Sequence, residues 1–191
     1  MSRIIGGSAG GRRLKVPAGE RTRPTSDRVR EALFSALESA LGSLQDRPFL
    51  DLYAGSGAIA FEAASRGAGP VVAVESDRRA AAVIGDNVAT TGLGVRVVTQ
   101  PVERFVTRTP DVAYDVVVAD PPYPLANDDL AGVLAALLEH GWLAEGATVV
   151  VERSARTPEP AWPAGLVRVR RKDYGETVLW YVHADTGSPV G

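Results

Sequence analysis

From about residue 48, short Val-rich apolar runs alternate with stretches of helical periodicity. The apolar runs are almost continuous, which is typical of strands buried on both faces of a sheet. Strands that alternate with helices run parallel and form a sheet covered by helices on both sides. We therefore predict an α/β, Rossmann-like fold.

The predicted elements follow this alternation to the end of the chain. The strands are 49–52, 71–75, 95–99, 115–120 and 147–152, and the helices are 58–66, 78–90, 102–108 and 130–140. Two further strands, 166–172 and 177–183, are joined by the turn 173–176 without a helix between them. We expect them to form an antiparallel hairpin that completes a seven-stranded, mostly parallel sheet.

The region before the alternation differs in pattern. Two short apolar segments, 3–6 and 13–17, flank a glycine-rich turn and predict a small β-hairpin. A helix follows, because apolar residues recur every four positions from Val29 to Leu41. We expect three parts: an arm over 1–25, a domain over 26–184 and a disordered tail over 185–191.

Composition excludes several classes of chemistry. The 191 residues contain no cysteine and only two histidines, His140 and His183. Disulfides, thiolate nucleophiles and histidine-based metal sites are therefore not expected, and we predict no metal. No apolar run approaches the ~20 residues that span a bilayer, and we expect no signal peptide. We expect a cytoplasmic monomer with no membrane contact.

Charge is distributed unevenly along the chain. The first 30 residues carry eight basic and two acidic side chains, although the whole chain has a net charge of −2. A basic arm on an acidic body is typical of nucleic-acid binding, although a solvated tail would show the same charge. The arm residues that we expect to contact RNA are Arg3, Arg12, Arg13, Lys15 and Arg23.

A glycine-containing turn follows the first strand of the alternation. Gly55 and Gly57 permit a tight turn that a ligand can approach closely. Asp51 would repel a pyrophosphate but suits a ligand with ammonium and sulfonium groups, such as S-adenosylmethionine. The predicted cofactor-binding residues of this turn are Asp51, Tyr53, Gly55, Ser56 and Gly57.

The next two strands end on polar side chains. Glu75, at the end of the second strand, is expected to accept hydrogen bonds from the ribose hydroxyls of the cofactor. Gln100 follows the third strand, where it could reach the adenine. A solvated strand end is the alternative for Glu75.

The strand 115–120 runs into Asp120-Pro121-Pro122-Tyr123. Both prolines restrict this backbone, so a carboxylate, a carbonyl and an aromatic ring keep a fixed relation. Such a cup suits the exocyclic amine of a nucleobase, which donates two hydrogens and stacks on the ring. We predict that Asp120, Pro121 and Tyr123 are catalytic and that Pro122 binds the substrate. The simpler alternative is a Pro-Pro turn that only ends the strand.

Together these features favour methyl transfer to nitrogen. A methyl donor at the glycine turn would face an amine held by Asp120. Methylation of cytosine C5 proceeds through a covalent thiolate adduct, and that route is closed to a chain without cysteine. Guanine and adenine amines both remain open on this reasoning.

The sequence resembles bacterial small-subunit ribosomal RNA guanine-N2 methyltransferases of the "methyltransferase D" type. The resemblance rests on 3–14, on Arg23 to Phe34, on the motifs at Asp51–Gly57, Glu75 and Asp120–Tyr123, and on the hairpin with Tyr174 and Tyr181. It implies a class I methyltransferase fold, S-adenosylmethionine as cofactor, and a guanine N2 of 16S ribosomal RNA in an assembling small subunit as substrate. It also places Thr25 near the active-site mouth, where we assign it to the cofactor.

Three alternatives remain open at this stage. A DNA adenine-N6 methyltransferase shares the acidic Pro-Pro-aromatic motif, although a chain this short leaves little room for a DNA target-recognition domain. A non-catalytic RNA-binding assembly factor could use the same scaffold. A nicotinamide-dependent dehydrogenase would tolerate Asp51 poorly at its phosphate site.

Overall fold

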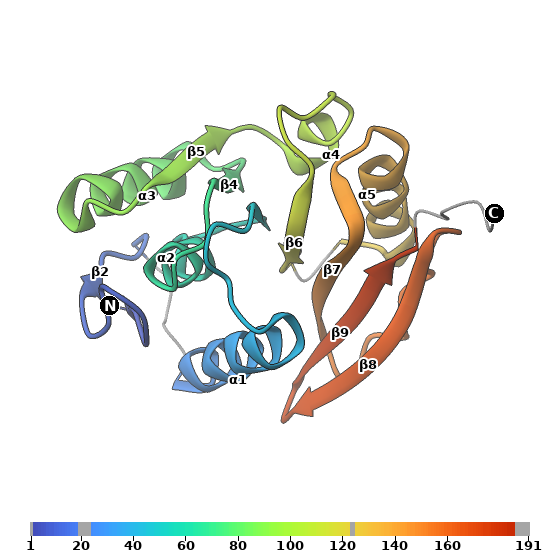
Figure 1. Cartoon of the computed structure of the whole chain (residues 1–191), viewed down its shortest axis with the longest axis horizontal. Helices are drawn as coiled ribbons and strands as arrows, with labels where there is room; N and C mark the ends of the chain where they lie inside the picture. The colour runs from blue at the N-terminus through green and yellow to red at the C-terminus, as the bar shows by residue number, and fades with distance from the viewer. Residues whose placement is uncertain (1, 19–23, 123–124, 186–191) are drawn as a thin grey trace. The chain divides into compact units, whose positions relative to one another are not determined.

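The computed structural model describes residues 2–18, 24–122 and 125–185, without the side chains of residues 24–26. The chain divides into two compact units, Met1–Gln100 and Pro101–Gly191, and each is described by itself. Figure 1 shows the helices and strands of both units. Among the described residues, no helix is both long and apolar enough to cross a membrane.

The first unit contains a small hairpin, three helices and a parallel sheet. Its elements are β1 (Ser2–Arg3), β2 (Arg13–Leu14), α1 (Pro24–Leu41), β3 (Phe49–Leu52), α2 (Ala58–Ser65), β4 (Val71–Glu75), α3 (Arg78–Thr91) and β5 (Val95–Thr99). The three longer strands lie in the order β5-β4-β3 and are parallel. Helix α2 packs on β3 and β4, and α3 packs on β4 and β5.

The second unit ends in an antiparallel hairpin. Its elements are α4 (Val102–Phe105), β6 (Tyr114–Ala119), α5 (Asn127–Glu139), β7 (Leu143–Ser154), β8 (Leu166–Tyr174) and β9 (Thr177–Ala184). The strands lie in the order β6-β7-β9-β8. β6 and β7 are parallel, whereas β9 is antiparallel to both β7 and β8. The seven main strands and the closing hairpin agree with the prediction.

Each unit has its own apolar core with aromatic contacts. In the first unit, the predicted apolar face of α1 is buried, and Phe34 stacks on Phe49 with ring centroids 5.9 Å apart. In the second unit, Trp142 lies 4.5 Å from Phe105 between ring centroids, and its indole nitrogen donates to the carbonyl of Val106 at 2.9 Å. The buried indole therefore has its polar group satisfied.

Several boundaries differ from the prediction for local reasons. Helix α1 begins at Pro24, before the apolar repeat that starts at Val29, because proline is well suited to the first helical position. β6 stops at Ala119, because Pro121 and Pro122 have no N–H to donate to a neighbouring strand. Helix α4 ends at Phe105 rather than at residue 108, and β7 begins at Leu143 rather than at residue 147. The strands of the N-terminal hairpin are only two residues long.

The N-terminal hairpin is docked on α2 through a buried carboxylate. The backbone nitrogens of Ile5 and Gly6 donate to the two carboxylate oxygens of Glu62 at 2.7 and 2.8 Å. Gly7 has a φ of 76°, and a Cβ there would collide with the backbone oxygen of Ser65. Close backbone approach therefore requires glycine at this position.

A second set of hydrogen bonds joins the segment after the hairpin to α3. Asn87 accepts from the backbone nitrogen of Lys15 at 2.9 Å and donates to the Lys15 carbonyl at 3.0 Å. Asn87 is buried, so this reciprocal pair fixes the backbone direction at Lys15. The predicted domain boundaries at 25 and 184 stay a prediction.

Candidate cofactor and acceptor sites

The first candidate site begins with Asp51, which lies on β3 and is 1% exposed. Its Oδ2 accepts the backbone N–H of Ala60 at 3.0 Å, in the first turn of α2. The first N–H groups of a helix have no partner within the helix and attract anions. Here a carboxylate of the chain itself accepts one of these N–H groups.

The turn between β3 and α2 has a left-handed backbone at three positions. The φ angles of Tyr53, Gly55 and Gly57 are 61°, 55° and 77°. A Cβ at Gly57 would lie 3.1 Å from a side-chain carbon of Ile84, which is tighter than an ordinary contact. Ser56 lies between the glycines and is half-buried. The turn therefore keeps its backbone close to the place that we predict for a ligand.

Glu75 connects this turn to the next one. Its Oε2 accepts the backbone N–H of Gly55 at 2.7 Å, and its Oε1 accepts that of Asp77 at 2.7 Å. Carboxylate oxygens accept more than one hydrogen bond each, so both remain able to accept a ribose hydroxyl. The half-buried position of Glu75 at the carboxyl end of β4 is where such sheets bind ribose.

Gln100 lies beside Glu75 at the same edge of the sheet. Its backbone nitrogen donates to the Glu75 carbonyl at 3.0 Å, and its side chain is buried. The structure thus brings together the predicted residues Asp51, Gly55, Gly57, Glu75 and Gln100 at the carboxyl ends of three neighbouring strands. The side chain of Thr25 lies outside the described residues, and its cofactor role stays a prediction.

Asp77, which the sequence reading did not single out, has a structural role at this edge. Its side chain accepts from the backbone nitrogens of Arg79 and Ala80, both at 2.8 Å, and so caps α3. An acidic residue directly before a helix is a recognisable capping signal that could have identified it. With Asp51 and Glu75, it gives this part of the first unit an acidic character, which fits a cationic ligand.

The second candidate site follows β6. Asp120 is exposed, Pro121 is buried and Pro122 is exposed, with the carbonyl of Pro122 accepting the backbone N–H of Leu125 at 2.9 Å. Tyr123 lies outside the described residues. The loop therefore presents a carboxylate directly after a buried strand, as predicted, while the stacking role of Tyr123 stays a prediction.

Glu152 is a neighbour of Asp120 that the sequence reading did not single out. The parallel register pairs Ala119 with Val151, so the next positions, Asp120 and Glu152, lie side by side on one face. Burial and then the negative charge of Asp120 raise the pKa of Glu152 from 4.5 to about 8. An acidic residue that ends a run of buried valines was the available signal.

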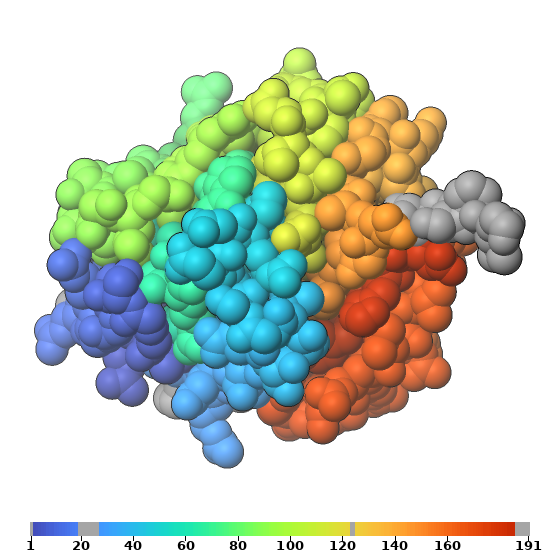
Figure 2. Space-filling view, viewed as in Figure 1, coloured from blue at the N-terminus to red at the C-terminus, as the bar shows by residue number. Residues whose placement is uncertain are grey.

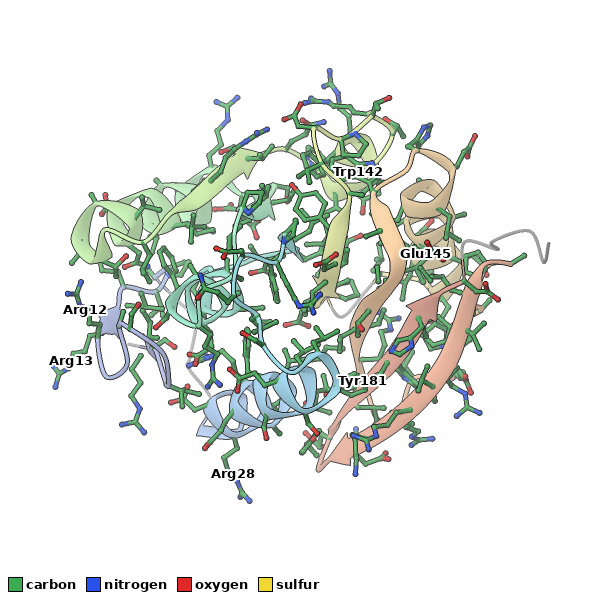
Figure 3. All side chains as sticks on the ribbon, viewed as in Figure 1. Arg12, Arg13, Arg28, Trp142, Glu145 and Tyr181 are labelled. Carbon is green, nitrogen blue, oxygen red and sulfur yellow. The ribbon has the colours of Figure 1, made fainter. Side chains whose placement is uncertain are left out.

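The predicted RNA-contacting cations of the hairpin lie on its surface. Figure 3 shows Arg12 and Arg13 pointing away from the hairpin. Arg12 also donates from Nη1 to the carbonyl of Thr91 at 2.8 Å, and Lys15 pairs with Asp86 at 3.0 Å. Arg3 is exposed and lies 3.8 Å from Asp27 between Nε and Oδ2. Arg23, the fifth predicted cation, lies outside the described residues.

Sequence reasoning also missed the buried ion cluster that supports the hairpin. Glu62 is 0% exposed and lies near two arginines, with Oε1 2.9 Å from Arg66 Nε and Oε2 3.8 Å from Arg30 Nε. A lone acid in the apolar helix segment Ala58–Ser65 was the only local sign. Its partners lie up to 57 residues away in the sequence, so spacing alone did not reveal them.

Comparison with known proteins places this geometry in context. A family model described as Conserved hypothetical protein 95 matches residues 2–183. The chain is 37% identical over 175 residues to "Ribosomal RNA small subunit methyltransferase D" of Escherichia coli (strain K12), covering 91% of this chain and 85% of that protein. It is 32% identical over 179 residues to "Putative rRNA methyltransferase YlbH" of Bacillus subtilis (strain 168), covering 92% and 95%.

A solved structure agrees with these sequence relatives. "Putative methyltransferase yhhF" from Escherichia coli matches with a TM-score of 0.85 and 34% identity, covering 97% of this chain and 99% of that one. The expected Rossmann-like methyltransferase fold is therefore confirmed.

Proposed function

The chain belongs to the Conserved hypothetical protein 95 family, and we propose that it methylates the exocyclic N2 amine of a guanine in 16S ribosomal RNA. S-adenosylmethionine is the methyl donor. The relatives from Escherichia coli and Bacillus subtilis bear the names of ribosomal RNA methyltransferases, which supports the substrate class. We further propose that a monomer acts in the cytoplasm on an assembling small subunit.

The observation that carries the donor assignment is the hydrogen bond between Asp51 and Ala60. A buried carboxylate at the first turn of α2 repels a pyrophosphate and attracts the cationic methionine part of the donor. The carboxylate of Glu75 supplies acceptors for the ribose hydroxyls, and the left-handed glycines let the backbone lie against the ligand. These residues fit S-adenosylmethionine, which supplies an electrophilic methyl group when bound.

Asp120 and the carbonyl of Pro121 are proposed to hold the acceptor. The guanine amine would donate one hydrogen to each, and this favours a more tetrahedral nitrogen whose lone pair is available. Tyr123 would stack on the base. Asp120 orients the amine and receives its proton after transfer, so it need not be a strong base before it.

The reaction requires that the amine held by Asp120 approach the methyl group in line with the bond that breaks. Positioning of this kind supplies much of the acceleration in reactions between two bound reactants. The proposal therefore assigns donor binding to the glycine turn and acceptor orientation to the Asp120 loop.

The test uses undermethylated small subunits, deproteinised 16S RNA and unmethylated DNA, each incubated with labelled S-adenosylmethionine. We expect label in the subunits and N2-methylguanosine among the nucleosides identified by mass spectrometry. Label in DNA alone, with N6-methyladenine as product, would instead establish a DNA methyltransferase. No label and no heat on titration with S-adenosylhomocysteine would identify a non-catalytic assembly factor.

A further inference from the structure

Strand β8 carries a dense group of cations far in sequence from the N-terminal arm. Four basic residues occupy five consecutive positions and all are exposed: Arg168, Arg170, Arg171 and Lys172. β8 is the last strand in the order β6-β7-β9-β8. Figure 2 shows its orange-red surface facing the viewer. The second unit therefore has a positive edge, although the chain carries a net charge of −2.

A β-bulge divides these cations between the two faces of the hairpin. Arg168 pairs with Val182, but Arg170 pairs with Tyr181, so Val169 is an extra residue in β8. Cross-strand partners share a face, and Val182 and Tyr181 point to opposite faces. The bulge therefore places Arg168 and Arg170 on opposite faces, although they are two positions apart.

The cations on one face already have partners. Arg168 forms an ion pair with Glu159 at 3.0 Å, and Arg171 forms an ion pair with Asp173 at 2.7 Å. Both guanidinium groups lie over the ring of Trp180, at 5.9 and 5.1 Å from its centroid. Ion pairing and stacking give this pair a packing role at the hairpin.

The cations on the other face lie in line with the candidate acceptor site. Lys172 on β8 lies opposite Leu179 on β9, and Leu179 lies opposite Glu152 on β7. Glu152 in turn lies beside Asp120. With about 4.8 Å between neighbouring strands, Lys172 and Asp120 are separated by roughly 14 Å across three strand steps.

Arg170 belongs to the preceding row of the same face. It lies opposite Tyr181 on β9. The same row continues with Val150 on β7 and Val118 on β6. Figure 3 shows Tyr181 on β9. Burial raises the pKa of Tyr181, and the charge of Arg170 opposes this rise, as expected for groups on one face. No ion pair is described for Arg170 or Lys172 within residues 2–18, 24–122 and 125–185.

We propose that Arg170 and Lys172 form a phosphate-binding site for the RNA strand that carries the target base. The proposal rests on the proposed function and names a contact in addition to the N-terminal arm. The phosphates that flank a nucleotide held at the exposed Asp120 can reach these exposed cations without crossing the face itself, where Val150, Leu179 and Tyr181 are buried. Their guanidinium and ammonium groups are the chemistry that binds phosphodiesters without reading sequence.

Protection of a sheet edge is the simpler role for cations on β8. Edge strands often carry Lys or Arg, which discourage pairing with another chain. That role requires charge but no particular face. The bulge separates Arg170 and Lys172 from Arg168 and leaves them on the face that carries Asp120, with Lys172 in the same row as Asp120, and this favours RNA.

The first test compares Arg170→Gln, Lys172→Gln and the double variant with wild type on undermethylated small subunits. Arg104→Gln is the matched control, since Arg104 is an exposed cation of α4 in the same unit. We expect KM for subunits to rise about tenfold per cation removed at 0.1 M salt, with kcat and S-adenosylhomocysteine affinity unchanged. The logarithmic salt dependence of binding should fall by roughly 1.4 to 1.8 in the double variant.

A wild-type KM in the double variant would overturn the phosphate site and leave the proposed function intact. Failure of the proposed function is recognised separately, as absence of label in ribosomal RNA with the wild-type protein. A rise in KM equal to that of Arg104→Gln would also overturn the site, because it would reflect net charge alone.

The second test uses the absence of cysteine in the chain. An iron chelate attached to Lys172→Cys cleaves nearby RNA when it is bound to subunits, and Arg104→Cys serves as the control. We expect cleavage within a few nucleotides of the methylated guanine for Lys172→Cys only. Cleavage elsewhere, or none in an otherwise active variant, would overturn the proposal and direct attention to a ribosomal protein as the partner of β8.

Discussion

Glu75 accepts the backbone N–H of Gly55 at 2.7 Å, although the two residues are 20 positions apart. The second oxygen of the same carboxylate accepts from Asp77 at 2.7 Å. One side chain thus ties the turn after β3 to the turn after β4. Loss of Glu75 would therefore disturb both the shape of the glycine turn and the proposed ribose contact.

We expect Glu75→Ala to weaken the binding of S-adenosylhomocysteine by at least about tenfold, because hydrogen bonds to a charged group each contribute roughly 1.5–3 kcal/mol. Titration calorimetry measures this directly. Glu139→Ala, which removes an exposed carboxylate on α5, is the control. Equal affinity in both variants would contradict the ribose role.

Asp120→Ala is expected to lower kcat by about 100-fold or more while leaving S-adenosylhomocysteine affinity unchanged, because Asp120 orients the acceptor. Asp120→Asn keeps an acceptor oxygen and should lose less. Single-turnover rates on undermethylated subunits provide the measurement. Wild-type turnover in Asp120→Ala would rule out the cup, and equal losses in both variants would assign the effect to charge.

The raised pKa of Glu152 makes the free energy of unfolding depend on pH. The unfolded chain releases this proton near 4.5, whereas the folded chain retains it to about 8. The folded state therefore binds more protons across this window, and the stability that Glu152 contributes is lost as the pH rises through it. Urea unfolding should show Glu152→Gln gaining stability relative to wild type from acid toward pH 8, by an amount on the order of a few kcal/mol.

Asp120→Asn provides the control for this pH dependence. The charge of Asp120 is the second cause of the raised pKa, after burial. Removal of that charge should lower the pKa of Glu152 in the folded chain, so that the loss of stability ends at a lower pH and is smaller. Parallel stability curves for wild type and Glu152→Gln would show that Glu152 titrates normally.

Gly7→Ala and Gly11→Ala separate backbone strain from collision in the hairpin. Both glycines have positive φ, 76° and 85°, so each substitution costs about 1–2 kcal/mol for a left-handed backbone. Only Gly7 lies against the Ser65 backbone, whereas nothing is within 4 Å of a Cβ at Gly11. We expect Gly7→Ala to lose roughly 1–3 kcal/mol more in free energy of unfolding. Equal losses would show that the hairpin does not dock closely on α2.

The features that sequence predicted best are those with a local cause. Val-rich runs located the parallel strands, and Asp51 and Glu75 could be placed near strand ends because each belongs to a run of buried residues. The hairpin of β8 and β9 was predictable because no helical segment separates the two strands.

The features that sequence did not predict depend on residues far apart in the chain. Glu62 became a buried anchor only because Ile5 and Gly6 fold against it. The raised pKa of Glu152 depends on burial and on Asp120, which directly follows the neighbouring strand β6. The bulge at Val169 reverses the alternation of β8, so a strict two-residue period would have put Arg168 and Arg170 on one face.

The N-terminal cations give the last prediction. Replacement of Arg12, Arg13 and Lys15 by glutamine should weaken binding to subunits and lower the logarithmic salt dependence by roughly 2 to 3, one counterion contribution for each lost phosphate contact. The exposed pair between Lys15 and Asp86 contributes little to stability, so the loss should not exceed roughly 1.5–3 kcal/mol, the contribution of the hydrogen bond from the charged Arg12 to the Thr91 carbonyl. Filter binding over a range of salt concentrations and urea unfolding measure the two effects, with Arg104→Gln as control. A variant with wild-type affinity and salt dependence would remove the hairpin from the RNA contact and leave β8 as the remaining candidate surface.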